Sequence, residues 1–160
     1  MTRIATFLWF ADEACEAVDF YVATLPDARR LATIPLPADT PFGPPGSVET
    51  IEFTLCGQLF IAMKAGTSEG FNHAFSVSVE LDTQEEIDRI WAAFLDNGGT
   101  ARQCGWLRDR WGLCWQIVPR RLAAMIASPD RAAARRAAEA MLTMVKLDLP
   151  RLEAAFVGKA

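Results

Sequence analysis

Residues 104–120, "CGWLRDRWGLCWQIVPR", consist of two apolar stretches on either side of a short polar turn. "WLRDR" precedes the turn and "LCWQIV" follows it, which predicts a β-hairpin closed around Trp111 and Gly112. Glycine accepts a positive φ at such a turn, and the side chain of Asp109 can bond the turn backbone. We therefore expect this stretch to be the closing hairpin of a sheet.

Side chains on the second strand of this hairpin alternate between two faces. Cys114, Gln116 and Val118 share one face, whereas Trp115 and Ile117 share the other. The two large apolar residues are expected to pack under helices. The amide of Gln116 then lies on the opposite, open face of the sheet.

The residues before the hairpin predict a strand, a helix and a further short strand. In "NHAFSVSVEL" (72–81), one face carries Phe75, Val77, Val79 and Leu81, and the other carries Ser76, Ser78 and Glu80. Asp82 or Thr83 is the expected N-cap of the helix. Its apolar stripe at helical spacing consists of Ile87, Ile90, Trp91, Phe94 and Leu95. "DNGG" (96–99) ends the helix, and a short strand is expected near 100–103.

The first half of the chain has the same order of elements. "RIATFLWF" (3–10) predicts a strand, and Asp12 is the expected N-cap of a helix over about 13–24. A short strand near 29–34 follows, and then "VETIEFTL" (48–55) and "QLFIAMK" (58–64) form a hairpin. Because the order occurs twice, we predict an α+β fold of two βαβββ modules that form a curved mixed sheet.

Only helices are expected after the second module. Ser128 is the predicted N-cap of a long alanine-rich helix with Pro129 at its first position, and Pro150 opens a last short helix. The single domain is therefore expected to comprise module one at about 1–66, module two at about 72–118, and C-terminal helices at about 119–157.

Composition limits the functional classes. Hydrophobic residues make up 51% of the 160 residues and charged residues 22%, which is typical of a compact globular domain. The net charge of −4 argues against a general nucleic-acid binder. No apolar run approaches the roughly 18 to 20 residues that a membrane span needs, and the first residues make a poor secretion signal. We expect a cytoplasmic protein without nucleic-acid or membrane partners and with four free thiols.

The sequence resembles the vicinal-oxygen-chelate superfamily, which has the fold of glyoxalase I and the bleomycin-resistance proteins. It is most similar to the PhnB-like branch, many of whose members carry the label 3-demethylubiquinone-9 3-methyltransferase. The resemblance rests on "FLWF…EACEAVDFY", "VETIEFTLCGQLFIAM", "QEEIDRIWAAFLDNGG", "QCGWLRDRWGLCWQIVPR" and "ASPDRAAARRAAEAMLTMVKLDL". It implies that the modules pair into a cup-shaped sheet, and that the protein is a homodimer.

The resemblance also locates the metal positions of glyoxalase-type members, which hold a divalent ion with His, Glu or Gln from four strands. In this sequence they fall on Thr6, about Ala62, Ala74 or Ser76, and Gln116. Three of the four are poor ligands or none, whereas such a metal usually has about three protein ligands. We therefore expect no metal and no other cofactor.

The expected lining of the cup comes from both modules. It consists of Thr6, Leu8, Phe10, Glu52, Ser76, Ser78, Trp106, Cys114 and Gln116. This mostly apolar surface suits a small organic ligand with one or two polar groups. Glu52 or a backbone group is the expected partner of the Gln116 amide. His73, the only histidine, shares the parity of Phe75 and is expected to face the helices in a structural or edge role, with a metal or acid–base role as the alternative, and no catalytic residue is predicted.

Three functions remain as alternatives at this stage, and they differ in whether the protein is an enzyme. The first is an enzyme or an enzyme-like binder of a small organic molecule in the cup, without a tightly held metal. The second is sequestration without chemistry, as in bleomycin-resistance relatives. The third is the methyltransferase of the family label. An S-adenosylmethionine site of Rossmann type needs a Gly-rich turn between a strand and a helix, and "CGQ", "DNGG" and "RWG" do not occur in that context.

Overall fold

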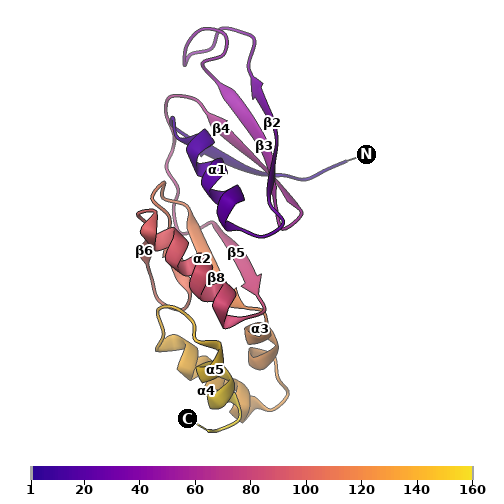
Figure 1. Ribbon diagram of the computed structural model, residues 1–160, viewed down its shortest axis with the longest axis vertical. Helices are drawn as coiled ribbons and strands as arrows, with labels where there is room; N and C mark the ends of the chain where they lie inside the picture. The colour runs from indigo at the N-terminus through magenta and orange to yellow at the C-terminus, as the bar shows by residue number, and fades with distance from the viewer. Residues whose placement is uncertain (1, 160) are drawn as a thin grey trace. The chain divides into compact units, whose positions relative to one another are not determined.

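The computed structural model describes residues 2–159, so residue 1 of the predicted first module and residue 160 lie outside it. The chain divides into two compact units between Gly70 and Phe71. Each unit contains a four-stranded mixed sheet with a helix that follows its first strand (Figure 1). This confirms the predicted α+β class and the repeated βαβββ order.

The first unit contains β1 (Thr6–Phe10), α1 (Ala14–Thr24), β2 (Arg29–Pro35), β3 (Glu49–Leu55) and β4 (Gln58–Lys64). Its strands lie in the order β1-β4-β3-β2. β1 runs parallel to β4, and the other neighbours are antiparallel. α1 packs on β3 and β4, as the arrangement in Figure 1 also shows. The alternation of "ETIEFTL" buries Ile51, Phe53 and Leu55, as predicted.

The side-chain orientation of β1 differs from the prediction. Leu8 pairs with Ala62, which in turn pairs with the buried Ile51, so these side chains share the helix-covered face. Leu8 is 1% exposed and Phe10 is 3% exposed. The prediction that they line the open face is therefore wrong. The only polar residue of "TFLWF", Thr6, shares the helix-covered parity of Leu8, and the other parity carries Phe7 and Trp9, so side-chain polarity does not mark the face that points away from α1.

Two helices also begin later than predicted. α1 has Glu13 rather than Asp12 at its N-cap, and no side chain caps it. α4 (Arg131–Leu142) is capped by Asp130, whose carboxylate accepts hydrogen bonds from the amides of residues 132 and 133 at 3.1 and 3.0 Å. Ser128 instead accepts a bond from the Asp130 amide, so the chain turns once more before the helix starts.

The second unit repeats the sheet with β5 (Ser76–Leu81), α2 (Gln84–Asp96), β6 (Thr100–Ala101), β7 (Trp106–Arg108) and β8 (Cys114–Pro119). The strand order is β5-β8-β7-β6, with β5 parallel to β8. Thr83 caps α2 in a reciprocal arrangement with Glu86, as the sequence allowed. The predicted stripe of α2 is buried at Ile87, Ile90, Trp91 and Phe94. This helix packs on β5 and β8.

The turn between β7 and β8 is organised by Asp109. Its Oδ1 accepts hydrogen bonds from the amides of Trp111 and Leu113, both at 3.0 Å, as the predicted turn requires. Its Oδ2 accepts a third bond from the indole Nε1 of Trp115 at 2.9 Å. Gly112 has a φ of +100°. The carboxylate therefore ties the turn to the core beneath α2.

The C-terminal helices α3 (Arg121–Ile126), α4 and α5 (Leu149–Phe156) belong to the second unit. Their shared core contains Leu122, Met125, Ala137, Met144, Leu147, Leu149 and Leu152. The segment between α4 and α5 is bonded to the β6–β7 loop, because the amides of Cys104 and Gly105 donate to the carbonyls of Met144 and Val145 at 2.8 and 2.7 Å. Within residues 2–159, none of the helices has the length and apolarity that crossing a membrane requires.

Candidate functional site

The open face of the second sheet brings together the five predicted residues of module two. In the parallel β5–β8 pair, Ser76 lies opposite Cys114 and Ser78 opposite Gln116. In the antiparallel β7–β8 pair, Trp106 lies opposite Gln116. The side chains that alternate with these residues point toward α2 instead. The candidate site is therefore built on three adjacent strands of one sheet.

A hydrogen bond orients the amide of Gln116 on this face. Its Nε2 donates to the hydroxyl of Ser76 at 2.9 Å. Glu52, considered as a partner from the sequence, instead forms an ion pair with Arg3 at 2.6 Å. Within residues 2–159 no hydrogen bond reaches Oε1 of Gln116, so this oxygen can accept one from a ligand.

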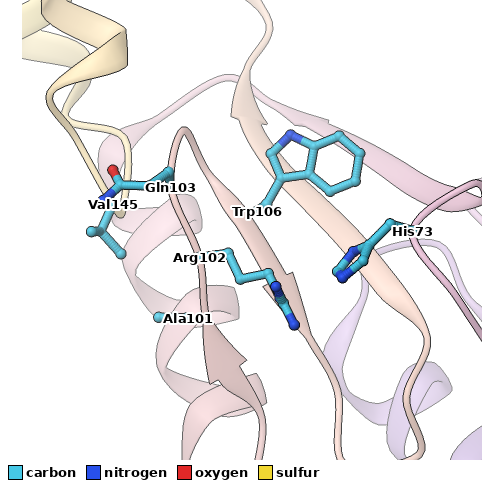
Figure 2. A pocket seen from close by; sticks show the side chains of 6 residues that line it. All are labelled: His73, Ala101, Arg102, Gln103, Trp106 and Val145. Atoms are coloured by element: carbon cyan, nitrogen blue, oxygen red, sulfur yellow. The ribbon is translucent and has the colours of Figure 1, made fainter.

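A pocket of about 600 Å³ adjoins this face. It is lined by His73, Ala101, Arg102, Gln103, Trp106 and Val145. Figure 2 shows the guanidinium of Arg102 directed toward the ring of His73, with the indole of Trp106 beside them. The β6–β7 loop is held in place by a bond from the Arg102 amide to the Trp106 carbonyl at 2.8 Å. Sequence reasoning found Trp106 but missed Arg102, which follows the end of a two-residue strand.

The charge of the pocket comes from Arg102. Its guanidinium makes no hydrogen bond or ion pair within residues 2–159, and no acidic side chain lines the pocket. Most other arginines of the second unit have partners, such as Arg121 with Glu153 and Arg135 with Glu139. A guanidinium presents a planar fork of donors that fits a carboxylate with two bonds. The pocket can therefore attract and orient an anion.

His73 lies beside Cys114, with 3.4 Å between Nδ1 and Sγ. The expectation that His73 faces the helices is therefore wrong. Strand parity does not apply to it, because β5 begins only at Ser76. Asn72 carried the missed signal: its side-chain oxygen accepts a bond from the Ala74 amide at 2.8 Å and turns the chain just before the strand.

The predicted cup residues of module one lie on both faces of the first sheet. Thr6 shares the helix-covered parity of Leu8 and Phe10, and its hydroxyl accepts a bond from Gln58 at 3.1 Å. Glu52 lies on the opposite face, because it neighbours the buried Ile51 on β3. These four side chains therefore do not line one surface.

The positions that the resemblance assigns to a metal do not fit a divalent ion. Ala62 and Ala74 have no donor atom, and Thr6 and Ala62 lie on the helix-covered face of the first sheet. Across residues 2–159, no three His, Cys, Asp or Glu side chains converge as metal ligands. These positions therefore offer a divalent ion too few donor atoms.

The family model of 3-demethylubiquinone-9 3-methyltransferase matches residues 2–118. The chain belongs to this family. The match confirms the resemblance to the PhnB-like branch of the vicinal-oxygen-chelate superfamily. No curated protein matches the chain.

Solved structures of this 3-demethylubiquinone-9 3-methyltransferase family and of more distant proteins share the fold. A PhnB protein from Bacillus cereus is 28% identical with a TM-score of 0.62, over 74% of this chain and 98% of that one. Protein PA1353 from Pseudomonas aeruginosa is 21% identical with a TM-score of 0.58, over 74% and 97%. The fosfomycin resistance protein FosX from Listeria monocytogenes, solved with Mn(II) and a dihydroxypropylphosphonic acid, is 12% identical with a TM-score of 0.53, over 75% and 93%. The last two likenesses concern the fold alone.

The family match ends at residue 118, before α3 begins. The C-terminal helices and their connecting segments, including "ASPDRAAARRAAEAMLTMVKLDL", therefore lie outside the residues that match the family model. Val145, which lines the pocket, belongs to this additional region. The pocket is thus formed jointly by the sheet that matches the family model and by a segment outside that match.

Proposed function

We propose that this protein binds a small organic anion in the pocket lined by His73, Arg102 and Trp106. The guanidinium of Arg102 carries the proposal, since it faces the pocket and has no partner within residues 2–159. A volume of about 600 Å³ is within the range of small-molecule sites. The ligand class is a planar, mostly apolar body with one carboxylate.

Each part of such a ligand has a matching group. The carboxylate pairs with Arg102, and the apolar body packs against the indole of Trp106. Gln116 does not line the pocket but lies opposite Trp106 in the sheet, so its Oε1 is proposed to accept a hydrogen bond from a hydroxyl or amide at the edge of the ligand, while Ser76 holds the amide in orientation. This set of one charge, one aromatic wall and one amide provides affinity and orientation together.

Thermal shift with matched ligand pairs tests this proposal. We expect benzoate, phenylacetate and salicylate to raise the melting temperature with concentration, and their neutral amides to have no such effect. Arg102→Gln should keep the fold and abolish the shift, and Gln116→Leu should keep the fold and weaken the shift for salicylate, whose hydroxyl can donate to Oε1. Arg29→Gln is the control, because it removes the same charge from an exposed position in the first unit. A shift that persists in Arg102→Gln, or that the amides reproduce, would refute the anion site.

The methyltransferase of the family label has no support in the described residues. The connections from a strand to the following helix are residues 11–13, 82–83 and 120, and none of them contains glycine. A phosphate or nucleotide normally approaches the backbone at such a turn through glycine. We therefore expect S-adenosylmethionine to bind more weakly than about 10 μM in isothermal titration. The homodimer stays a prediction, which sedimentation velocity checks.

A further inference from the structure

We infer that Cys114 and His73 form a thiol–imidazole pair that adds covalently to an electrophilic ligand in this pocket. The ligand class is an α,β-unsaturated carbonyl compound that carries a carboxylate. The inference rests on the proposed anion site and assigns it a reaction. It starts from the distance of 3.4 Å between Sγ of Cys114 and Nδ1 of His73.

The surroundings of this thiol differ from those of a structural cysteine. A cysteine buried among apolar groups is inert. Cys114 is 1% exposed. Its sulfur contacts Nδ1 of His73, the only histidine in the sequence. Ser76 lies opposite it in the sheet, and Gln116 follows on the same face. A nucleophile with a base at hydrogen-bond distance is the arrangement that covalent catalysis uses.

The pocket leads to the thiol through His73. The imidazole is exposed and lines the pocket, whereas the thiol behind it is buried. His73 precedes β5 and lies outside regular structure, so the proposal requires its exposed side chain to shift, with Nδ1 still facing Sγ, for a ligand in the pocket to reach the sulfur. Arg102 points toward the same ring from the opposite wall (Figure 2). A carboxylate bound by Arg102 therefore places the rest of the ligand against the pair.

The addition balances without another reactant. Nδ1 of His73 takes the thiol proton as Sγ of Cys114 forms a bond to the β-carbon of the ligand. The π electrons of the carbon–carbon double bond move to the α-carbon and carbonyl, giving an enolate. His73 then returns the proton to the α-carbon, which leaves a thioether and a neutral carbonyl. Arg102 holds the carboxylate throughout.

Site-resolved alkylation tests the pair with two reagents that share one reactive group. 3-Maleimidopropionate carries a carboxylate, and N-ethylmaleimide does not. The full chain is treated briefly with each reagent, and modification of the cysteines is followed by peptide mass spectrometry. Cys56 is the internal reference: it is exposed, and desolvation together with the Asp27 carboxylate raises the pKa of its thiol.

We expect Cys114 to react with 3-maleimidopropionate at least about tenfold faster than Cys56, although Cys114 is buried. Arg102→Gln should remove the preference for the charged reagent. His73→Asn should slow Cys114 about tenfold or more with both reagents, because the base is lost. Benzoate is not an electrophile, so its thermal shift measures ligand binding separately from the reaction.

Two outcomes would overturn the inference while leaving the binding proposal intact. In the first, Cys114 reacts only after the chain is denatured, as a structural cysteine does. In the second, His73→Asn leaves its rate unchanged or raises it, which would show that the imidazole only shields the sulfur. Both readouts follow the rate at a single cysteine, so they do not depend on the thermal-shift assay.

Discussion

Replacing Asp109 by asparagine should destabilise the second unit by about 2 kcal/mol, because it removes one charge-assisted hydrogen bond in a buried site. Asp109 is 5% exposed. An asparagine oxygen can still accept the two backbone amides of the turn. Its NH₂ group, however, then faces the indole N–H of Trp115, and two donors cannot bond each other. Asp109→Ala removes these three hydrogen bonds and should cost about 4 kcal/mol.

Urea unfolding followed by tryptophan fluorescence measures this cost, and a double-mutant cycle assigns it. In a Trp115→Phe background the indole donor is absent, so Asp109→Asn should lose most of its effect, with a coupling of about 1–2 kcal/mol. Asp96→Asn is the control, since it removes the same charge from an exposed position on the same unit. Its effect should stay within about 0.5 kcal/mol.

An unfolding free energy of Asp109→Asn within about 0.5 kcal/mol of that of the unmodified chain would refute this role of the carboxylate. An equal cost with and without the indole of Trp115 would refute it as well. Either result would mean that the turn is held by its backbone alone.

Two further predictions concern backbone space and acid stability. Gly105→Ala should destabilise the protein clearly more than Gly57→Ala, for which we expect about 1–2 kcal/mol. Both glycines have a φ of +78°. A Cβ at position 105 would lie 2.8 Å from the Ile117 carbonyl oxygen, whereas a Cβ at position 57 would meet no heavy atom within 4 Å. Equal costs in urea unfolding would contradict this. The amide and hydroxyl of Thr83 bond the Glu86 carboxylate and lower the pKa of this carboxyl group in the folded chain. The stabilisation that the ionised Glu86 provides is therefore present above the unfolded pKa of about 4.3, and it is lost as the pH falls through the lower folded pKa. Glu86→Gln should therefore reduce the loss of stability below about pH 4.5, and an unchanged pH dependence of the urea midpoint would contradict this.

Much of the fold follows from the sequence, because in many segments the hydrophobic pattern and the turn or capping residues predict the same element. The hairpin of β3 and β4 has one apolar face, and α2 combines an apolar stripe with a capping box. The start of α4 was missed because Ser128 and Asp130 are both good N-caps two residues apart. Only the hydrogen bonds of the folded chain select between them.

The residues of the candidate site were predictable only where the alternation of side chains along a strand decides which face of the sheet they occupy. Gln116, Ser76 and Trp106 follow from strand parity, and the structure places them together. The contact of His73 with Cys114 joins residues 41 positions apart and depends on the register of the parallel β5–β8 pair. No turn length fixes the register of a parallel pair.

The bonds between the β6–β7 loop and the segment after α4 have a consequence for synthesis on the ribosome. The first sheet has all its strands once Lys64 has been added. The amide of Gly105, in contrast, finds its acceptor only when Val145 is present, about 40 residues later. At about 5–20 residues per second, translation needs roughly 2–8 s for this distance. During that interval the amides of Cys104 and Gly105 lack these acceptors, so we expect the β6–β7 loop of the nascent chain to stay accessible to chaperones while residues 106–145 are being made.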